Sequence, residues 1–154
     1  ELESNDIDRI IVSESITWMP TPRLYVNGVV HFVDDSYETP TAEATGGAER
    51  LVVDLDNDYV TFTLATGYAV NDNVDIELDY FRYEASNYVN NADVSQPYGQ
   101  SRDEDRIRLR WKHRIDGNTR YVLQYGYYAN NDATSGHRND FNGHVVYGKL
   151  QYRF

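Results

Sequence analysis

Five basic residues at every second position form the chemically most distinctive segment of the chain. They are Arg106, Arg108, Arg110, Lys112 and Arg114, and the residues between them are mostly apolar. Because successive side chains of a β-strand point to opposite faces of a sheet, this spacing predicts one continuous basic stripe on a single face. Such a stripe can orient or select charged solutes, or it can be neutralised by acidic residues on a neighbouring strand.

A second alternating segment supplies acidic partners for this stripe. In a strand predicted over residues 74–87, the acids on one face are Asp75, Glu77 and Asp79. If this strand pairs with the basic one, these acids are expected to face, in that order, Arg114, Lys112 and Arg110 or the diagonal neighbours of those residues. A salt-bridge ladder is one interpretation, and a solute-orienting lining is the other. Surplus positive charge is expected at Arg106 and Arg108, because three acids neutralise only part of five bases.

Seven segments of the chain show the alternation of apolar and polar residues that is typical of strands. They cover residues 9–19, 23–34, 58–70, 74–87, 105–115, 119–130 and 143–154. Short turns are predicted at Pro20-Thr21-Pro22, Asn71-Asp72-Asn73 and Asp116-Gly117-Asn118, and long polar loops alternate with them. We therefore expect an all-β, antiparallel up-and-down sheet, with residues 1–154 forming a single segment.

Aromatic residues on the apolar faces gather near the predicted strand ends. Those near the short turns are Trp18, Tyr68 and Tyr121, and those nearer the long loops are Phe32, Tyr80 and Tyr127. Two aromatic belts flanking an apolar band are typical of a transmembrane β-barrel with a polar lumen. About eleven residues per strand at ~3.3 Å each, tilted by ~45°, span roughly 25 Å, the height of such a band. Glu14 fits least well, because it shares the apolar face of the first strand.

Composition restricts the function classes. The formal net charge of −11 argues against nucleic-acid binding through bulk charge, and the lack of cysteine excludes disulfides and thiolate metal sites. The four histidines are dispersed and no Ser–His–acid set is recognisable, so we expect no enzyme, cofactor or metal site. The acidic loop over residues 34–58 has oxygen ligands that bind divalent ions weakly, although a solvated loop is the simpler interpretation.

The last ten residues resemble the C-terminal strand of Gram-negative outer-membrane proteins. Members of that family end in Phe and have an aromatic or apolar residue at every second position before it. The matching residues are Val146, Leu150, Tyr152 and Phe154, whereas Gly148 departs in size. The resemblance implies a barrel in the bacterial outer membrane, in contact with lipid and lipopolysaccharide. It also implies that the barrel assembly machinery recognises the four matching residues.

A second resemblance covers residues 16–40. The segments 16–24 and 34–40 are similar to hairpins of the MtrB/PioB-type barrels, which sheathe multihaem cytochromes. This resemblance implies a lumenal or periplasmic cytochrome as a partner. The haem would belong to that partner, because the sequence contains no C-x-x-C-H motif.

The alternation of short and long connections predicts that the first and last strands run in the same direction, toward the periplasm. Single-chain bacterial barrels have even strand numbers, so we expect the C-terminal part of a larger barrel. Four functions stay open. They are a porin-like pore for small hydrophilic solutes, a scaffold around a multihaem cytochrome, a plugged ligand-gated transporter and a soluble antiparallel β-sandwich binding module.

Overall fold

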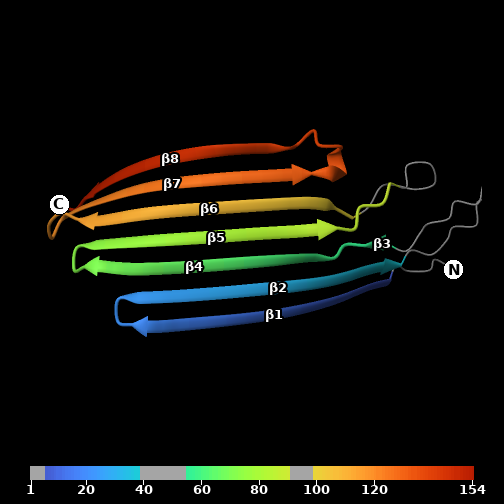
Figure 1. Cartoon of the computed structure of the whole chain (residues 1–154), viewed down its shortest axis with the longest axis horizontal. Helices are drawn as coiled ribbons and strands as arrows, with labels where there is room; N and C mark the ends of the chain where they lie inside the picture. Colours follow the sequence, from blue (N-terminus) through green and yellow to red (C-terminus); the bar gives the residue numbers. More distant parts are fainter. Residues whose placement is uncertain (1–5, 39–54, 91–98) are drawn as a thin grey trace, which may run out of the picture.

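Seven long strands form one sheet in the computed structural model, which describes residues 6–38, 55–90 and 99–154 (Figure 1). The long strands are β1 (Asp6–Thr21), β2 (Leu24–Glu38), β4 (Tyr59–Asn71), β5 (Val74–Ser86), β6 (Ser101–Arg114), β7 (Thr119–Asp132) and β8 (Phe141–Tyr152). A two-residue strand, β3 (Leu55–Asp56), pairs with β2, and a short 3₁₀ helix, η1 (Ala133–Ser135), follows β7. Each long strand pairs antiparallel with the next in the order β1-β2-β4-β5-β6-β7-β8, which confirms the predicted up-and-down sheet.

The observed strands extend past the predicted ones at the long-loop end of the sheet. β1 begins at Asp6, β2 ends at Glu38 and β6 begins at Ser101. The first turn lies at Pro22-Arg23, so the predicted turn at Pro20-Thr21-Pro22 was placed too early. The register shifts between Trp18 and Thr21, and this irregularity accommodates Pro20, which has no N–H for the ladder. The central part of the acidic loop, residues 39–54, lies outside the described residues.

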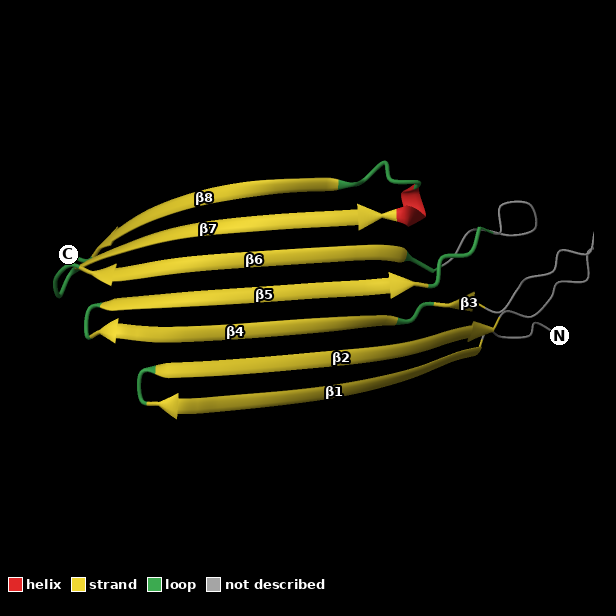
Figure 2. Ribbon diagram, viewed as in Figure 1, coloured by secondary structure: helices red, strands yellow, loops and turns green. Residues whose placement is uncertain are grey.

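The sheet is a single layer, and no second sheet packs on either face within the described ranges (Figure 2). The only apolar residues buried among them are Val33 and Ala85, whereas residues such as Ile16 and Leu150 stay more than half exposed. No helix in the described parts of the chain is long and apolar enough to cross a membrane. The exposed apolar face therefore requires a covering medium or partner.

The apolar band crosses its face of the sheet obliquely. On β5 the band ends at Arg82, which lies in the same cross-strand row as Phe62 and Val30. On β2, however, the band continues past Val30 to Phe32 and ends at Asp34. The strands are thus tilted relative to the band. The sheet is not closed into a barrel, because β1 and β8 form its two edges.

Two aromatic rings cover glycines on the polar face. Tyr25 on β2 lies directly opposite Gly67 on β4, and a Cβ added to Gly67 would lie 2.6 Å from Tyr25 Cζ. The ring of Tyr128 covers Gly126 in the same way, because a Cβ there would lie 2.8 Å from Tyr128 Cε2. Each ring fills the space that a side chain would otherwise occupy and packs on the glycine backbone. This packing stabilises the sheet at the glycine.

The turn between β6 and β7 is held by the carboxylate of Asp116. Its Oδ1 accepts hydrogen bonds from the backbone N–H groups of Asn118 and Thr119, both at 2.8 Å, and its Oδ2 accepts one from Thr119 Oγ1 at 3.0 Å. These bonds favour the ionised form and hold the pKa of Asp116 below its usual value of 3.8.

We expect the stabilising effect of Asp116 to disappear in acid. A carboxyl group with a depressed pKa in the folded state stabilises that state above its unfolded pKa, and the effect is lost as pH falls through the folded pKa. Asp116→Ala is therefore expected to lower the free energy of unfolding at pH 7 and to have progressively less effect below pH 3.8. Urea unfolding of both proteins from pH 7 to pH 3 measures this, and a difference that stays constant with pH would contradict it.

Candidate functional site

An ion-pair ladder connects β5 and β6 on the polar face. The register places Asp75 opposite Lys112, Glu77 opposite Arg110 and Asp79 opposite Arg108. Arg110 Nη1 lies 2.6 Å from Glu77 Oε2, and Lys112 bonds the other oxygen of the same carboxylate. Arg108 Nη2 lies 2.8 Å from Asp79 Oδ2. Glu77 is the most shielded member, with 17% of its side chain exposed, and two cations neutralise it.

The register differs by two residues from the direct pairing expected from the sequence, so the predicted surplus charge was placed at the wrong end. Arg108 is paired with Asp79, and Arg106 Nε lies 3.0 Å from Glu104 Oε1. The guanidinium of Arg106 also stacks 3.9 Å from the centre of the Phe81 ring. Arg114 has no acidic partner in the described residues, so the uncompensated end of the stripe is the short-turn end.

A hollow of about 230 Å³ lies on the polar face beside this ladder. Its lining combines cations with aromatic rings, namely Arg106, Arg108, Phe81 and Tyr128, together with Thr63 and Asp79. Across β6, Arg110 Nε donates to Gln124 Oε1 at 3.2 Å, which ties the ladder to β7. The polar face thus offers fixed charges and a concave surface, an arrangement able to hold a small hydrophilic solute. The sequence pattern did not reveal the roles of Glu104 and Gln124.

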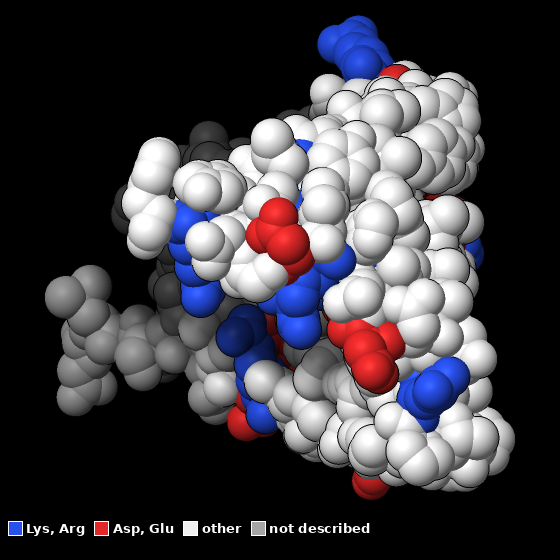
Figure 3. Space-filling view, turned by 90° about the vertical axis from the view of Figure 1, so that its left-hand side faces the viewer, with Lys and Arg blue, Asp and Glu red and all other residues white. Residues whose placement is uncertain are grey.

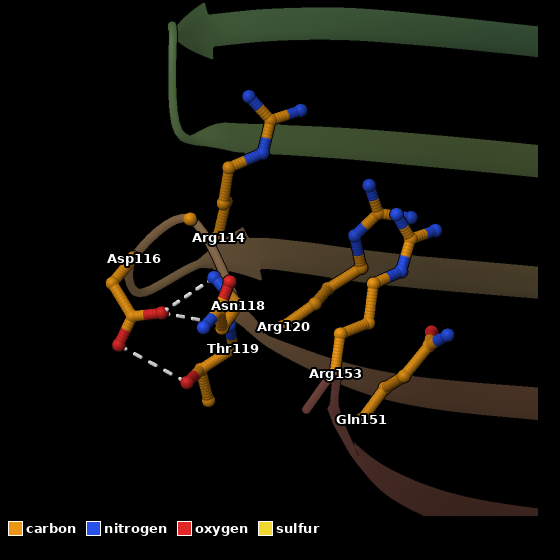
Figure 4. A pocket seen from close by; sticks show the side chains of 8 residues that line it. Arg114, Asp116, Asn118, Thr119, Arg120, Gln151 and Arg153 are labelled. Atoms are coloured by element: carbon orange, nitrogen blue, oxygen red, sulfur yellow. Dashed lines mark hydrogen bonds between the residues drawn. The ribbon is translucent and has the colours of Figure 1, made fainter.

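A second hollow, of about 280 Å³, lies at the short-turn end of β6, β7 and β8 (Figure 4). Three arginines line it, Arg114, Arg120 and Arg153, together with Gln151 and the residues of the Asp116 turn. Arg114 and Arg120 lie directly opposite each other in the β6–β7 pair. Basic side chains gather at this end of the molecule in Figure 3 as well.

On the apolar face, polar groups lie at the border of the apolar band that is nearer the long-loop end of the sheet. Tyr80 Oη donates to Asp105 Oδ1 at 2.7 Å, and Arg82 Nη1 lies 2.9 Å from Asp105 Oδ2. The register places all six residues of the predicted aromatic belts on this face: Trp18, Phe32, Tyr68, Tyr80, Tyr121 and Tyr127. Glu14 lies opposite Val30 on the same face, as the sequence pattern indicated.

The predicted assembly signal lies on the last strand and is exposed. Val146, Leu150 and Tyr152 share the apolar face of β8 and keep 73%, 67% and 54% of their surfaces exposed. The ring of Phe154, which follows β8, packs edge-on against Tyr152 with centroids 5.1 Å apart. These side chains are therefore available for contact with lipid or with another protein.

Groups capable of nucleophilic or metal chemistry are sparse. Ser13 Oγ and His31 Nδ1 lie 2.8 Å apart across β1 and β2. No carboxylate within the described ranges bonds His31, so the pair is not extended into a triad. No cluster of three or more potential metal ligands occurs in the same part of the chain.

No protein-family model, curated protein or solved structure matches this chain.

Proposed function

We propose that this chain forms part of the wall of an outer-membrane β-barrel and that its polar face lines a pore for small hydrophilic solutes. The observation that carries the proposal is the single-layer sheet with one exposed apolar face and one charged face. A soluble protein buries its apolar face against a second layer, and the described residues supply none. Lipid covers such a face without any second layer, provided that every strand edge is paired.

The oblique apolar band supports the same proposal. A sheet packed face to face in a soluble sandwich needs no tilt between its strands and its apolar band, whereas a barrel wall does. The border group of Tyr80, Arg82 and Asp105 then lies at the height where hydrocarbon gives way to headgroups. Aromatic residues are enriched at that height, and polar groups are tolerated there. Lipid and lipopolysaccharide are the partners that this face fits.

Closure of the wall requires strands beyond those described. β1 and β8 form the two edges of the sheet and run in the same direction. Their direct pairing would give one parallel seam in an otherwise antiparallel sheet. We propose instead that further antiparallel strands connect the edges. Phe154 and Tyr152, with Leu150 and Val146, would be the residues that the barrel assembly machinery recognises.

The ion-pair ladder and the hollow beside it would supply the fixed charges and the space of the lumen. Side-chain charges that are held by partners keep their positions, and fixed charges lining a pore select ions by sign. Small residues on the polar face of β4, such as Thr63, Ala65 and Ala69, leave space next to the ladder. The same space would accommodate a lumenal protein, which makes a scaffold around a multihaem cytochrome the second candidate.

Recording current across a planar lipid bilayer tests the proposal with the full-length polypeptide. We expect stepwise conductance, and we expect Arg106→Glu with Arg108→Glu to shift the permeability ratio severalfold toward cations. The matched control exchanges one pair, Asp79→Arg with Arg108→Asp, which keeps the lumen charge and is expected to leave the ratio unchanged. Insertion without current until a co-purifying protein is removed would favour the scaffold. A protein that stays monodisperse without detergent would overturn the membrane proposal.

A further inference from the structure

The hollow at the short-turn end has a strong positive charge that no acidic group of the described chain balances. Arg114, Arg120 and Arg153 line it, and none of them forms an ion pair within the described residues. Figure 4 shows the side chains of Arg120 and Arg153 extending in the same direction, away from the Asp116 turn. Like charges directly opposite in a sheet are unfavourable, so an anion bound among these exposed arginines would stabilise the grouping.

The single acid of the hollow is engaged elsewhere. The Asp116 carboxylate accepts three hydrogen bonds from its own turn, which are the dashed lines in Figure 4. This contrasts with the middle of the stripe, where each cation from Arg106 to Lys112 has a carboxylate partner. The arginines at the short-turn end therefore differ from the cations of the ladder in having no carboxylate partner, so they are available to a ligand.

The backbone fixes the positions of the three arginines. Arg114 and Arg120 are paired in the β6–β7 ladder, and Gln151 lies opposite Arg120 in the β7–β8 ladder. Arg153 follows β8, and its backbone N–H donates to the Asn118 carbonyl at 3.0 Å, which ties the chain end to the turn. The site is thus built on three strands and one turn, so only the side-chain ends need to adjust to a ligand.

We propose that this hollow is a binding site for a phosphate-type oxyanion carried by a soluble solute. Each guanidinium presents planar N–H donors that match phosphate oxygens in pairs, and the Gln151 amide adds a further donor. A carboxylate carries one negative charge and two acceptor oxygens, which is too little to pair with three guanidinium groups. A phosphate dianion has more charge and more acceptor oxygens, so it can pair with all three. The side chains lie on the polar face, opposite to the face of Leu150 and Tyr152, so the ligand is a solute of the lumen rather than a lipid headgroup.

This inference deepens the proposed function and depends on it only for the statement that the polar face lines a lumen. At the short-turn end, the site would stand at one mouth of the pore. It would concentrate phosphate-bearing solutes there before they reach the ion-pair ladder. Binding is measurable without any conductance, so the two proposals fail separately.

Isothermal titration of the detergent-solubilised full-length protein with inorganic phosphate tests the site. We expect saturable binding that Arg120→Gln and Arg153→Gln each weaken about tenfold and that the double variant abolishes. Arg23→Gln is the matched control, because Arg23 lies in another turn at the same end and donates to the Val70 carbonyl. This control is expected to bind phosphate as the unaltered protein does.

Three results would overturn the proposal. The first is no phosphate binding by the unaltered protein, and the second is equal loss in Arg23→Gln and Arg120→Gln, which would indicate a bulk charge effect. The third is binding of a short-chain phosphatidylglycerol without binding of phosphate, which would assign the hollow to lipid. A protein that binds phosphate but carries no current would refute the pore alone, and one that conducts without binding phosphate would refute the site alone.

Discussion

Leu109→Arg is expected to destabilise the folded protein strongly in phospholipid vesicles. Leu109 lies in the middle of the apolar band, opposite Leu78 on β5 and Tyr125 on β7. A cationic side chain at the midplane of a barrel's lipid-facing surface costs about 2–4 kcal/mol. A loss of that size removes a large part of the free energy that stabilises an ordinary domain. Urea titration of the full-length protein in large unilamellar vesicles measures the change.

The matched control introduces the same side chain on the polar face. Ala65 lies on β4 opposite Asp79, so an arginine there meets a carboxylate and an aqueous surface. Ala65→Arg is expected to change the free energy of unfolding by less than ~1 kcal/mol, as exposed ion pairs usually do. Equal destabilisation by the two substitutions would mean that lipid does not cover the face of Leu109.

Gly67→Ala is expected to destabilise the sheet by about 1–3 kcal/mol, the usual cost of overpacking. The added methyl group overlaps the ring of Tyr25, which must swing away and give up its contact with the β4 backbone. The free energy of unfolding, again from urea titration, measures the loss. Gly143→Ala is the control, because nothing lies within 4 Å of the position that its methyl group would take.

A double-mutant cycle separates this contact from the general effect of changing a glycine. If the Tyr25 ring causes the loss, Gly67→Ala should cost much less in a Tyr25→Ala background. Residues in contact typically show coupling energies of 0.5–3 kcal/mol in either sign, roughly the range expected here. Additive effects of the two substitutions would contradict the proposed contact.

The strands and their faces were accessible from the sequence because alternation encodes both. The strand predicted over residues 74–87 is observed at Val74–Ser86, and all six belt residues lie on one face. The sequence was less informative where both faces are polar. At the start of β6, Arg102, Asp103 and Glu104 are all charged, so no alternation marked them as strand residues. That is why Glu104, the partner of Arg106, was missed.

Register could be predicted only across short turns. The three-residue turn at Asp116-Gly117-Asn118 places Arg114 near Arg120, so this pairing could be predicted from the sequence. Fourteen residues, 87–100, separate β5 from β6 in the sequence, so no short turn specifies which residues of the two strands face each other. The pairing of Glu77 with Arg110, rather than with Lys112 alone, depends on side-chain packing across two strands.

The two unpaired edges of the sheet have a consequence for how the proposed barrel reaches its membrane. Backbone groups along β1 and β8 cannot be hydrated in hydrocarbon, and each unsatisfied group costs several kcal/mol there. Insertion of a partly assembled wall into the bilayer is therefore unfavourable, however stable its individual hairpins are. Insertion of the proposed barrel would therefore be all-or-none, because both edges must be paired before the bilayer accepts the wall.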